Sequence, residues 1–137
     1  MRLVIKIYLT GTHGTTFGGS PLACAMGHHV LTRLSSRAFR TKMEDVSGYF
    51  GERLSKLPKW YPGILEEDIR GRGFIRGLGF KDPSHPGKIV ELARERGVFF
   101  LTAGKDAVRF VPSLNVERED VDLAVNVLES CLSIAEL

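Results

Sequence analysis

The strongest constraint on the fold is residues 11–21, which read Gly-Thr-His-Gly-Thr-Thr-Phe-Gly-Gly-Ser-Pro. Glycine reaches backbone conformations with positive φ and lets a ligand approach closely, and threonine supplies hydroxyl donors. Ser20 is a favourable helix N-cap and Pro21 a favourable first helical residue, so a helix is predicted to follow from Leu22. Unpaired N–H groups at the start of that helix attract an anion. The stretch therefore predicts a phosphate-binding loop.

Two other interpretations of this loop compete with phosphate binding. Gly14 and Gly19 have the spacing of the two glycines in a nucleoside-triphosphate loop, but Ser20 stands where that motif needs a lysine. ATP or GTP binding is therefore disfavoured. A glycine-rich turn that binds no ligand remains open. His13 can either donate to a phosphate or fix the turn, and the turn is favoured.

The composition is that of an ordinary globular domain. The chain has 137 residues, of which 43% are hydrophobic and 26% charged, and this suits one domain that needs no disulfide. Its net charge of +3 is small and its basic residues are scattered, so neither nucleic acid nor an anionic membrane is an expected partner. Cys24 and Cys131 each lie in an apolar helical pattern, which predicts two buried free thiols. Cys24 and His28 have no convincing third ligand, so a metal site is not expected.

Apolar residues recur at helical intervals in four segments of the chain. Ser36 is expected to begin the second helix and Pro58 to end it, and Pro86 and Gly97 are expected to bound the third. Acidic residues suit the positive first turn of the last helix. The helices are expected over residues 22–35, 36–57 and 86–97, and from about residue 117 onward.

The remaining apolar runs read as strands. Residues 3–9 have strand composition, and residues 69–80 read as one long strand with glycine at positions 71, 73, 77 and 79. These glycines leave one face of the strand nearly bare, which marks a bulge or the close approach of another backbone. Residues 98–101 and 107–111 read as two short strands joined by a turn. The order of elements predicts an α+β fold, with a small, mostly antiparallel sheet covered by helices and preceded by the glycine-rich loop and a linking helix.

Arg109 interrupts the apolar run from Ala107 to Val111 on one of these short strands. Its guanidinium is therefore expected to be buried, and a buried guanidinium needs an anionic partner. The planar fork matches a carboxylate through two hydrogen bonds. The partner is either the carboxylate of a substrate or an internal Asp or Glu, and the residue pattern does not choose between them.

Three segments resemble the class III pyridoxal-phosphate aminotransferases, in the order in which that family has them. They are residues 13–23, in and after the loop; residues 70–74, Arg-Gly-Arg-Gly-Phe; and residues 102–114, which begin Thr-Ala-Gly and end Val-Arg-Phe-Val-Pro-Ser-Leu. The resemblance covers about residues 11–135. Within the class it is greatest to acetylornithine aminotransferase, followed by ornithine and succinylornithine aminotransferases. It implies the C-terminal small domain of a fold type I enzyme.

The resemblance also implies roles for three residues. Thr16 would bind the phosphate of pyridoxal 5'-phosphate, and Thr15 would contact the substrate in the partner subunit's site of a homodimer. Arg109 would hold the α-carboxylate of 2-oxoglutarate or glutamate. These roles agree with the anion-binding loop and the carboxylate-binding arginine expected from the residues alone. The family usually has asparagine at the position of Ser20, and because both residue types cap helices, the helix start should be kept.

The lysine that binds the cofactor in this family would precede Met1, so no catalytic residue is assigned in this chain. The chain is expected to be the C-terminal part of an acetylornithine-type aminotransferase that is inactive alone, does not bind the cofactor stably, and self-associates through apolar surface. The parent enzyme would convert N-acetylornithine and 2-oxoglutarate to N-acetylglutamate semialdehyde and glutamate, in arginine biosynthesis. The expected division is residues 1–20 for the strand-like run and loop, 21–35 for the linking helix and 36–137 for the small domain.

The partners implied by the resemblance are a large cofactor-binding domain, a second subunit and the two small-molecule substrates, inside the cell in the cytoplasm or the mitochondrion. Two hypotheses from other classes remain. A stand-alone module could bind a phosphorylated metabolite through the loop, and Thr16→Ala would then weaken binding. An interaction domain in which Arg109 pairs internally would instead unfold on Arg109→Ala.

Overall fold

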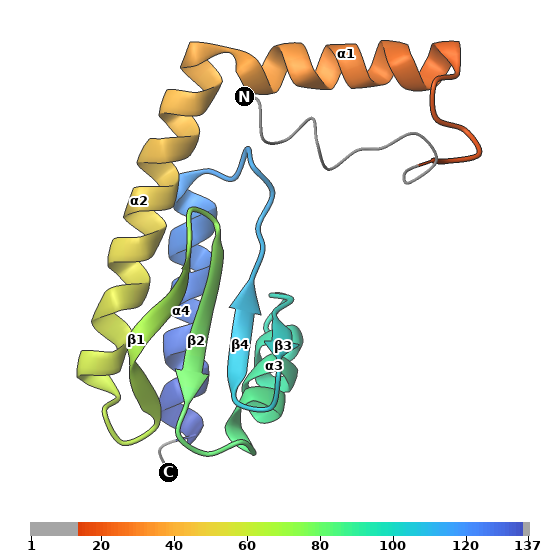
Figure 1. The fold of residues 1–137 in the computed structure, drawn as a ribbon. Coiled ribbons are helices and arrows are strands. Elements are labelled where there is room, and N and C mark those ends of the chain that lie inside the picture. The colour runs from red at the N-terminus through yellow and green to blue at the C-terminus, as the bar shows by residue number, and fades with distance from the viewer. Residues whose placement is uncertain (1–13, 136–137) are drawn as a thin grey trace. The chain divides into compact units, whose positions relative to one another are not determined.

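The computed structural model describes residues 14–135, in which two helices are followed by two strands, a helix, two more strands and a last helix. The expected strand at residues 3–9 and the loop residues before Gly14 lie outside this range. The chain divides into two compact units, Met1–Arg40 and Thr41–Leu137. Among the helices of the described residues, none has the length and hydropathy needed to cross a membrane. The elements are α1 (Pro21–Ser35), α2 (Arg37–Trp60), β1 (Leu65–Arg72), β2 (Ile75–Phe80), α3 (His85–Glu95), β3 (Leu101–Ala103), β4 (Ala107–Phe110) and α4 (Arg118–Ala135) (Figure 1).

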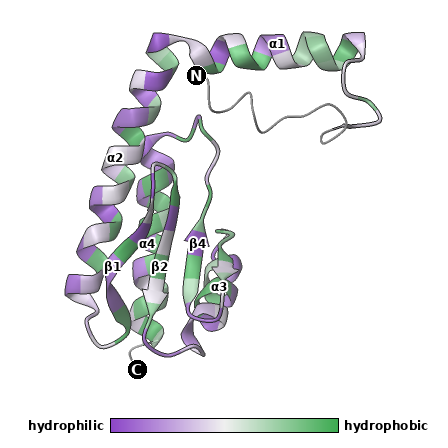
Figure 2. Cartoon of the chain, viewed as in Figure 1, coloured by the Kyte–Doolittle hydropathy of each residue, from purple (hydrophilic) through white to green (hydrophobic). Residues whose placement is uncertain are grey.

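Helix α1 begins where the sequence predicts. The Ser20 hydroxyl accepts a hydrogen bond from the Ala23 N–H at 3.3 Å, and Pro21 is the first helical residue. Ser36 ends α1 and begins α2, because its hydroxyl accepts from the Phe39 N–H at 3.3 Å. Apolar residues recur along α1 (Figure 2).

Cys24 in α1 is exposed, whereas Cys131 in α4 is buried, and both thiols are free. The prediction of a buried Cys24 is therefore wrong. No residue of Pro21–Ser35 is buried, and Leu22 and Met26 are 75% and 57% exposed. The described residues of this unit, 14–40, contain only α1 and the first turn of α2, and these residues offer no second apolar face to cover α1. The helical pattern identifies an apolar face but does not say what covers it.

The second unit contains a single antiparallel sheet with the strand order β1-β2-β4-β3 (Figure 1). Its register pairs Arg70 with Gly77, Gly77 with Arg109, and Arg109 with Leu101, so these four residues form one row across the sheet. Directly paired residues point to the same face of a sheet. Helices α2, α3 and α4 pack against the opposite face. The expected α+β fold with a helix-covered antiparallel sheet is confirmed.

The core lies between these helices and one face of the sheet. Leu78 of β2 and Val108 and Phe110 of β4 are buried, as alternate residues of half-buried strands must be. Phe110 meets Phe50 and Phe100 edge to face, with ring centroids 5.8 and 5.1 Å apart. The predicted apolar faces of the helices are buried here, with Val46, Phe50, Leu54 and Leu57 from α2, Ile89 and Ala93 from α3, and Val121, Val125, Leu128 and Leu132 from α4.

Residues 69–80, expected to form one long strand, belong instead to the hairpin of β1 and β2. Arg72 pairs with Ile75, so the turn contains only Gly73 and Phe74. Gly73 has a φ of 60°, and a two-residue hairpin turn of type II′ needs a positive φ at this first position. Gly73 therefore lies in the turn, whereas Gly71 stays in β1 and Gly77 and Gly79 stay in β2. The sequence pattern does not distinguish the turn glycine from the strand glycines, because glycine fits either conformation.

Helix α2 continues past Pro58, which was expected to end it. The helix ends at Trp60, and the Tyr61 N–H donates to the Leu57 carbonyl at 2.9 Å. A proline in the last turn removes only one backbone hydrogen bond. Pro58 is also buried in the core, which offsets that loss.

Gly97 caps helix α3 as predicted, two residues after the helix ends at Glu95. The φ of Gly97 is 79°, its N–H donates to the Arg94 carbonyl at 3.0 Å, and the Val98 N–H donates to the Ala93 carbonyl at 3.0 Å. These two bonds make a Schellman motif. Because Val98 is tied to the helix in this way, β3 begins at Leu101 and not at residue 98 as expected.

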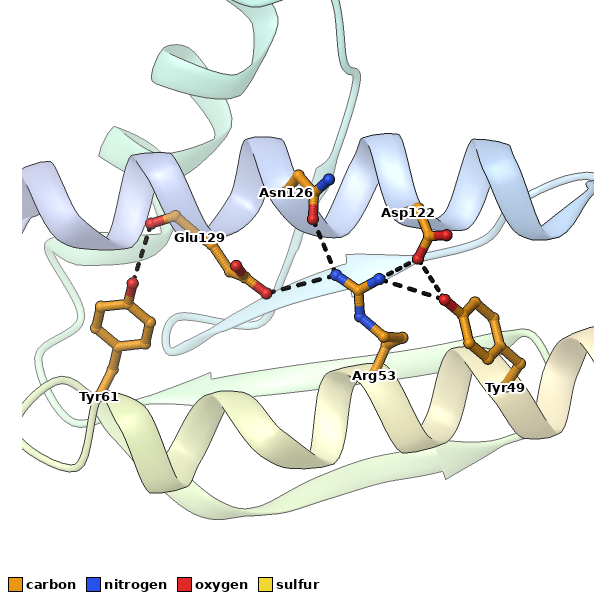
Figure 3. A network of polar contacts seen from close by, with 6 residues as sticks. All are labelled: Tyr49, Arg53, Tyr61, Asp122, Asn126 and Glu129. Atoms are coloured by element: carbon orange, nitrogen blue, oxygen red, sulfur yellow. Dashed lines mark hydrogen bonds and ion pairs between the residues drawn. The ribbon is translucent and has the colours of Figure 1, made fainter.

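Arg53 joins α2 to α4 through a polar network (Figure 3). Its guanidinium donates to the Tyr49 hydroxyl at 3.3 Å and to the Asn126 amide oxygen at 2.9 Å, and it forms ion pairs with Asp122 and, at 3.6 Å, with Glu129. A guanidinium can serve several acceptors at once because its donors are fixed in a plane. The network holds together two of the helices that cover the sheet.

Replacing Gly71 by alanine should strongly destabilise the second unit. Gly71 has a φ of 96°, and an added Cβ would lie 2.2 Å from the backbone oxygen of Ile75 across the hairpin. We expect the free energy of unfolding to fall by about 2–4 kcal/mol, because the backbone is strained and the strands must separate. Urea denaturation followed by circular dichroism measures this change.

The matched control is Gly48→Ala. Gly48 is exposed within α2, and an added Cβ would meet no atom within 4 Å. Alanine favours a helix over glycine, so this variant should gain up to about 1 kcal/mol. Equal effects of the two substitutions would contradict the hairpin geometry described for Gly71.

Candidate functional site

Arg109 lies on β4, on the face of the sheet opposite the helices. Its neighbours Val108 and Phe110 are buried, and side chains alternate along a strand, so Arg109 is exposed. The prediction of a buried guanidinium is wrong, because the helices of residues 41–135 cover only the other face. The ion pairs of the described residues do not include Arg109, so the internal partner considered above is not found. The guanidinium can accept an external carboxylate as its partner.

Strand β2, beside Arg109, carries almost no side chains on this face. Gly77 pairs directly with Arg109 and offers only backbone. Gly79, two residues along, is buried beneath the side chains of Glu66 and Arg70, and a Cβ added there would lie 2.8 Å from Glu66 Cγ. The bare face predicted from alternating glycines is confirmed at these two positions. An anion can therefore approach Arg109 over Gly77 without displacing a side chain of β2.

Arg70 and Asp106 form an ion pair that crosses the bare strand. Arg70 Nη2 and Nη1 donate to the two carboxylate oxygens of Asp106 at 3.1 and 3.5 Å. These hydrogen bonds, with the opposite charges, raise the pKa of Arg70 and lower the pKa of the Asp106 carboxyl. The Asp106 carbonyl also accepts from the Phe80 N–H at 2.7 Å. This pair was not predicted from the sequence, although the glycines of β2 indicate that a side chain could cross that strand.

The turn between β3 and β4 fixes the register of Arg109. Ala103 pairs with Ala107, which leaves residues 104–106 as the loop. The first of these is Gly104, with a φ of 64°, a conformation that a residue with a side chain rarely adopts. The connection is therefore shorter than the expected five residues from Thr102.

The loop before α1 has the features of an anion site. Thr15 and Thr16 are exposed. A Cβ added at Gly18 would lie 2.1 Å from Thr15 Cγ2, and Gly19 has a φ of 78°, so glycine suits both positions. The loop leads through Ser20 into the first turn of α1, where Pro21 has no N–H and the Ala23 and Cys24 N–H groups donate to Ser20, so Leu22 carries the remaining N–H. Hydroxyl and backbone N–H donors of this kind fit a phosphate group.

The predicted site residues fall in both units of the chain. Thr15 and Thr16 belong to the first unit and Arg109 to the second. His13 lies outside the described residues. Within residues 14–135, no group of three or more His, Cys, Asp or Glu residues could hold a metal ion.

A cavity of about 150 Å³ lies between α4 and the end of β4. Its walls are largely apolar and include Phe100 and Phe110. The carboxylate of Asp120 also borders it but already accepts a hydrogen bond from the Glu117 N–H at 3.1 Å, at the start of α4. Arg109 does not line this cavity. The cavity is therefore separate from the anion-binding residues.

Comparisons with known proteins match the chain to one family. The sequence profile of the family described as "Aminotransferase class-III" matches residues 2–132. The mitochondrial acetylornithine aminotransferase of Candida glabrata is 40% identical over 123 residues, which cover 90% of this chain and 28% of that protein. The succinylornithine transaminase of Photorhabdus laumondii is 37% identical over 132 residues, which cover 94% of this chain and 32% of that protein.

A solved structure extends the match to the fold. The ornithine aminotransferase of Toxoplasma gondii, which shows partial occupancy of PLP at its active site, has a TM-score of 0.76 and 31% identity to this chain. The match covers 97% of this chain and 32% of that one. The chain thus spans 28% to 32% of the length of these three relatives.

The two cysteines should react at different rates with a chromogenic disulfide reagent. Cys24 is exposed, whereas Cys131 is buried in the core. Burial raises the pKa of the Cys131 thiol, which lowers the fraction of the reactive thiolate. One thiol per chain should react rapidly in buffer, and the second only in urea. Cys24→Ser should remove the rapid phase, and two rapidly reacting thiols would contradict the burial of Cys131.

Proposed function

We propose that this chain, which belongs to the class III aminotransferases, is the carboxylate-binding small domain of an acetylornithine-type transaminase. Membership of this family implies dependence on pyridoxal 5'-phosphate. The whole protein would transfer the terminal amino group of N-acetylornithine to 2-oxoglutarate, giving N-acetylglutamate semialdehyde and glutamate in arginine biosynthesis. The 40% identity to an acetylornithine aminotransferase supports this substrate. Ornithine and N-succinylornithine are the alternatives, because relatives with those names also match.

The observation that carries the proposal is the exposed guanidinium of Arg109 beside the bare strand. Its fork can donate two parallel hydrogen bonds to one carboxylate. Gly77 leaves room for the bound molecule, and no carboxylate of residues 14–135 forms an ion pair with Arg109. Arg109 would thus hold the α-carboxylate of 2-oxoglutarate or glutamate and fix the direction in which its α-carbon points.

The loop before α1 would contribute to binding the cofactor. Pyridoxal 5'-phosphate, when bound, supplies an aldehyde and an electron-withdrawing ring. The Thr16 hydroxyl and the Leu22 N–H at the start of α1 would donate hydrogen bonds to its phosphate. Thr15 would contact the substrate in the site of a partner subunit. Ser20 caps α1 and is not assigned to the phosphate, because its hydroxyl already accepts a hydrogen bond from the Ala23 N–H.

The proposed partners are a large cofactor-binding domain and a second subunit. In α1, Leu22, Met26 and Leu31 are 75%, 57% and 64% exposed. Apolar surface of this kind is usually covered by another protein surface, which supports the proposal of such partners. Relatives from Candida glabrata, Yarrowia lipolytica and Saccharomyces cerevisiae are named as mitochondrial proteins, which supports a mitochondrial location.

Arg109→Met should abolish binding of 2-oxoglutarate to the chain. In the wild-type chain, titration with 2-oxoglutarate should shift the NMR signal of the Arg109 Nε–H group, with a dissociation constant of about 1 mM for this single weak contact. The control is Arg118→Met, because Arg118 is also exposed but is paired with Asp45 at 2.7 Å. Unchanged affinity in the Arg109 variant would contradict the proposed carboxylate site.

Thr16→Ala should weaken the binding of pyridoxal 5'-phosphate by about tenfold, because one hydrogen bond to a charged phosphate is lost. Equilibrium dialysis measures the affinity. Thr32→Ala, at an exposed position of α1, is the control. We expect borohydride treatment of the loaded chain to leave no stoichiometric adduct. A stoichiometric adduct at one lysine would instead show that this chain itself carries the covalent chemistry.

A further inference from the structure

Arg70 binds Asp106 across an intervening strand. Arg70 lies on β1 and Asp106 in the turn before β4, with β2 between them. The guanidinium passes over Gly79, where an added Cβ would lie 3.2 Å from Arg70 Nη2, and it reaches both carboxylate oxygens at 3.1 and 3.5 Å. The side chain of Glu66 also lies over Gly79. This crossing is possible because β2 has no side chain at that position.

Arg109 is a second arginine that could reach the same carboxylate. Arg70 and Arg109 lie in one row of the sheet, at the level of Gly77. Arg109 is on the strand that Asp106 leads into, three residues along, which is about 10 Å. To reach Asp106, Arg70 must extend the same distance along the strand direction. It must also reach across two strand spacings, which is about 9–10 Å sideways. Measured between backbone positions, Arg109 is therefore the nearer arginine, yet among the described residues Asp106 pairs with Arg70.

We propose that Arg70 is a positioning residue, which holds the Asp106 carboxylate so that the Arg109 guanidinium stays open to a substrate carboxylate. This inference rests on the proposed role of Arg109 and extends it to a residue that touches no substrate. Without Arg70, the Asp106 carboxylate turns to Arg109 and competes with the ligand for the same fork of donors. Exposed ion pairs add little stability to a fold. The effect of Arg70 is therefore to decide which arginine the Asp106 carboxylate binds, and not to stabilise the domain.

The direct test follows the titration of the Asp106 carboxyl carbon by NMR in the 137-residue chain. In Arg70→Met, the pKa of Asp106 should stay below its ordinary range, because Arg109 takes the place of Arg70. In the double variant with Arg109→Met, the pKa should return to that range. Lys105→Met, which removes the charge of the neighbouring lysine, is the control and should leave the pKa of Asp106 unchanged. A return of the pKa in Arg70→Met alone would overturn the proposal.

The second test measures the affinity for 2-oxoglutarate. Arg70→Met should weaken binding about two- to fivefold, and adding Asp106→Asn should restore it to within about twofold of wild type, because the competing carboxylate is gone. Arg72→Met removes a positive charge from the same face without breaking an ion pair. It should therefore weaken the binding of 2-oxoglutarate by less than about twofold. A merely structural role for Arg70 gives no rescue by Asp106→Asn, and that result would also overturn the proposal.

The two tests separate this proposal from the proposed function. If the wild-type chain does not bind 2-oxoglutarate through Arg109, the proposed function fails, while the titration of Asp106 still decides whether Arg109 replaces Arg70. Circular dichroism establishes that each variant is folded. If Arg70→Met does not fold, Arg70→Gln repeats the titration with an uncharged polar side chain, with the same two outcomes.

Discussion

Strand β2 is apolar on one face and bare on the other, and both the core and the candidate site depend on this asymmetry. Its buried Leu78 and Phe80 pack toward the helices, whereas Gly77 and Gly79 present only backbone to the opposite side. A strand sends alternate residues to opposite faces, so one six-residue segment can close the core and open a binding face together. Arg109 can be exposed beside buried neighbours for the same reason.

The arginines of this unit differ in function because their surroundings differ. Arg53, whose side chain is only 18% exposed, is held by three hydrogen-bond acceptors and an ion pair with Glu129, and it connects two helices. Arg70 is more than half exposed, and its pair with Asp106 adds little stability but decides where a carboxylate lies. Arg109 has no ion pair within the described residues, so its donors can meet a ligand. Burial and neighbours, and not residue type, separate a structural arginine from a binding one.

The candidate site could be predicted only in part. The loop with Thr15 and Thr16 is recognisable because its glycines, threonines and helix start are contiguous in sequence. Arg109 stood out as a charge in an apolar run, but its burial was predicted wrongly, since the pattern of one strand does not say which face is covered. The contact of Arg70 with Asp106 was not predicted, because the two residues are 36 positions apart and meet only through the register of three strands.

The sequence by itself determined the capped helix ends and the faces that can be buried, although not the end of α2. Ser20 begins α1 and Gly97 follows α3 because capping is a local matter of side-chain hydrogen bonds and backbone conformation. Only the tertiary structure decided that residues 69–80 enter a hairpin, that Cys24 is exposed while its apolar pattern suggests burial, and that Arg109 faces away from the helices. Those outcomes depend on which segments, distant in sequence, pair and pack together. The periodicity of one segment does not identify the segment that it packs against.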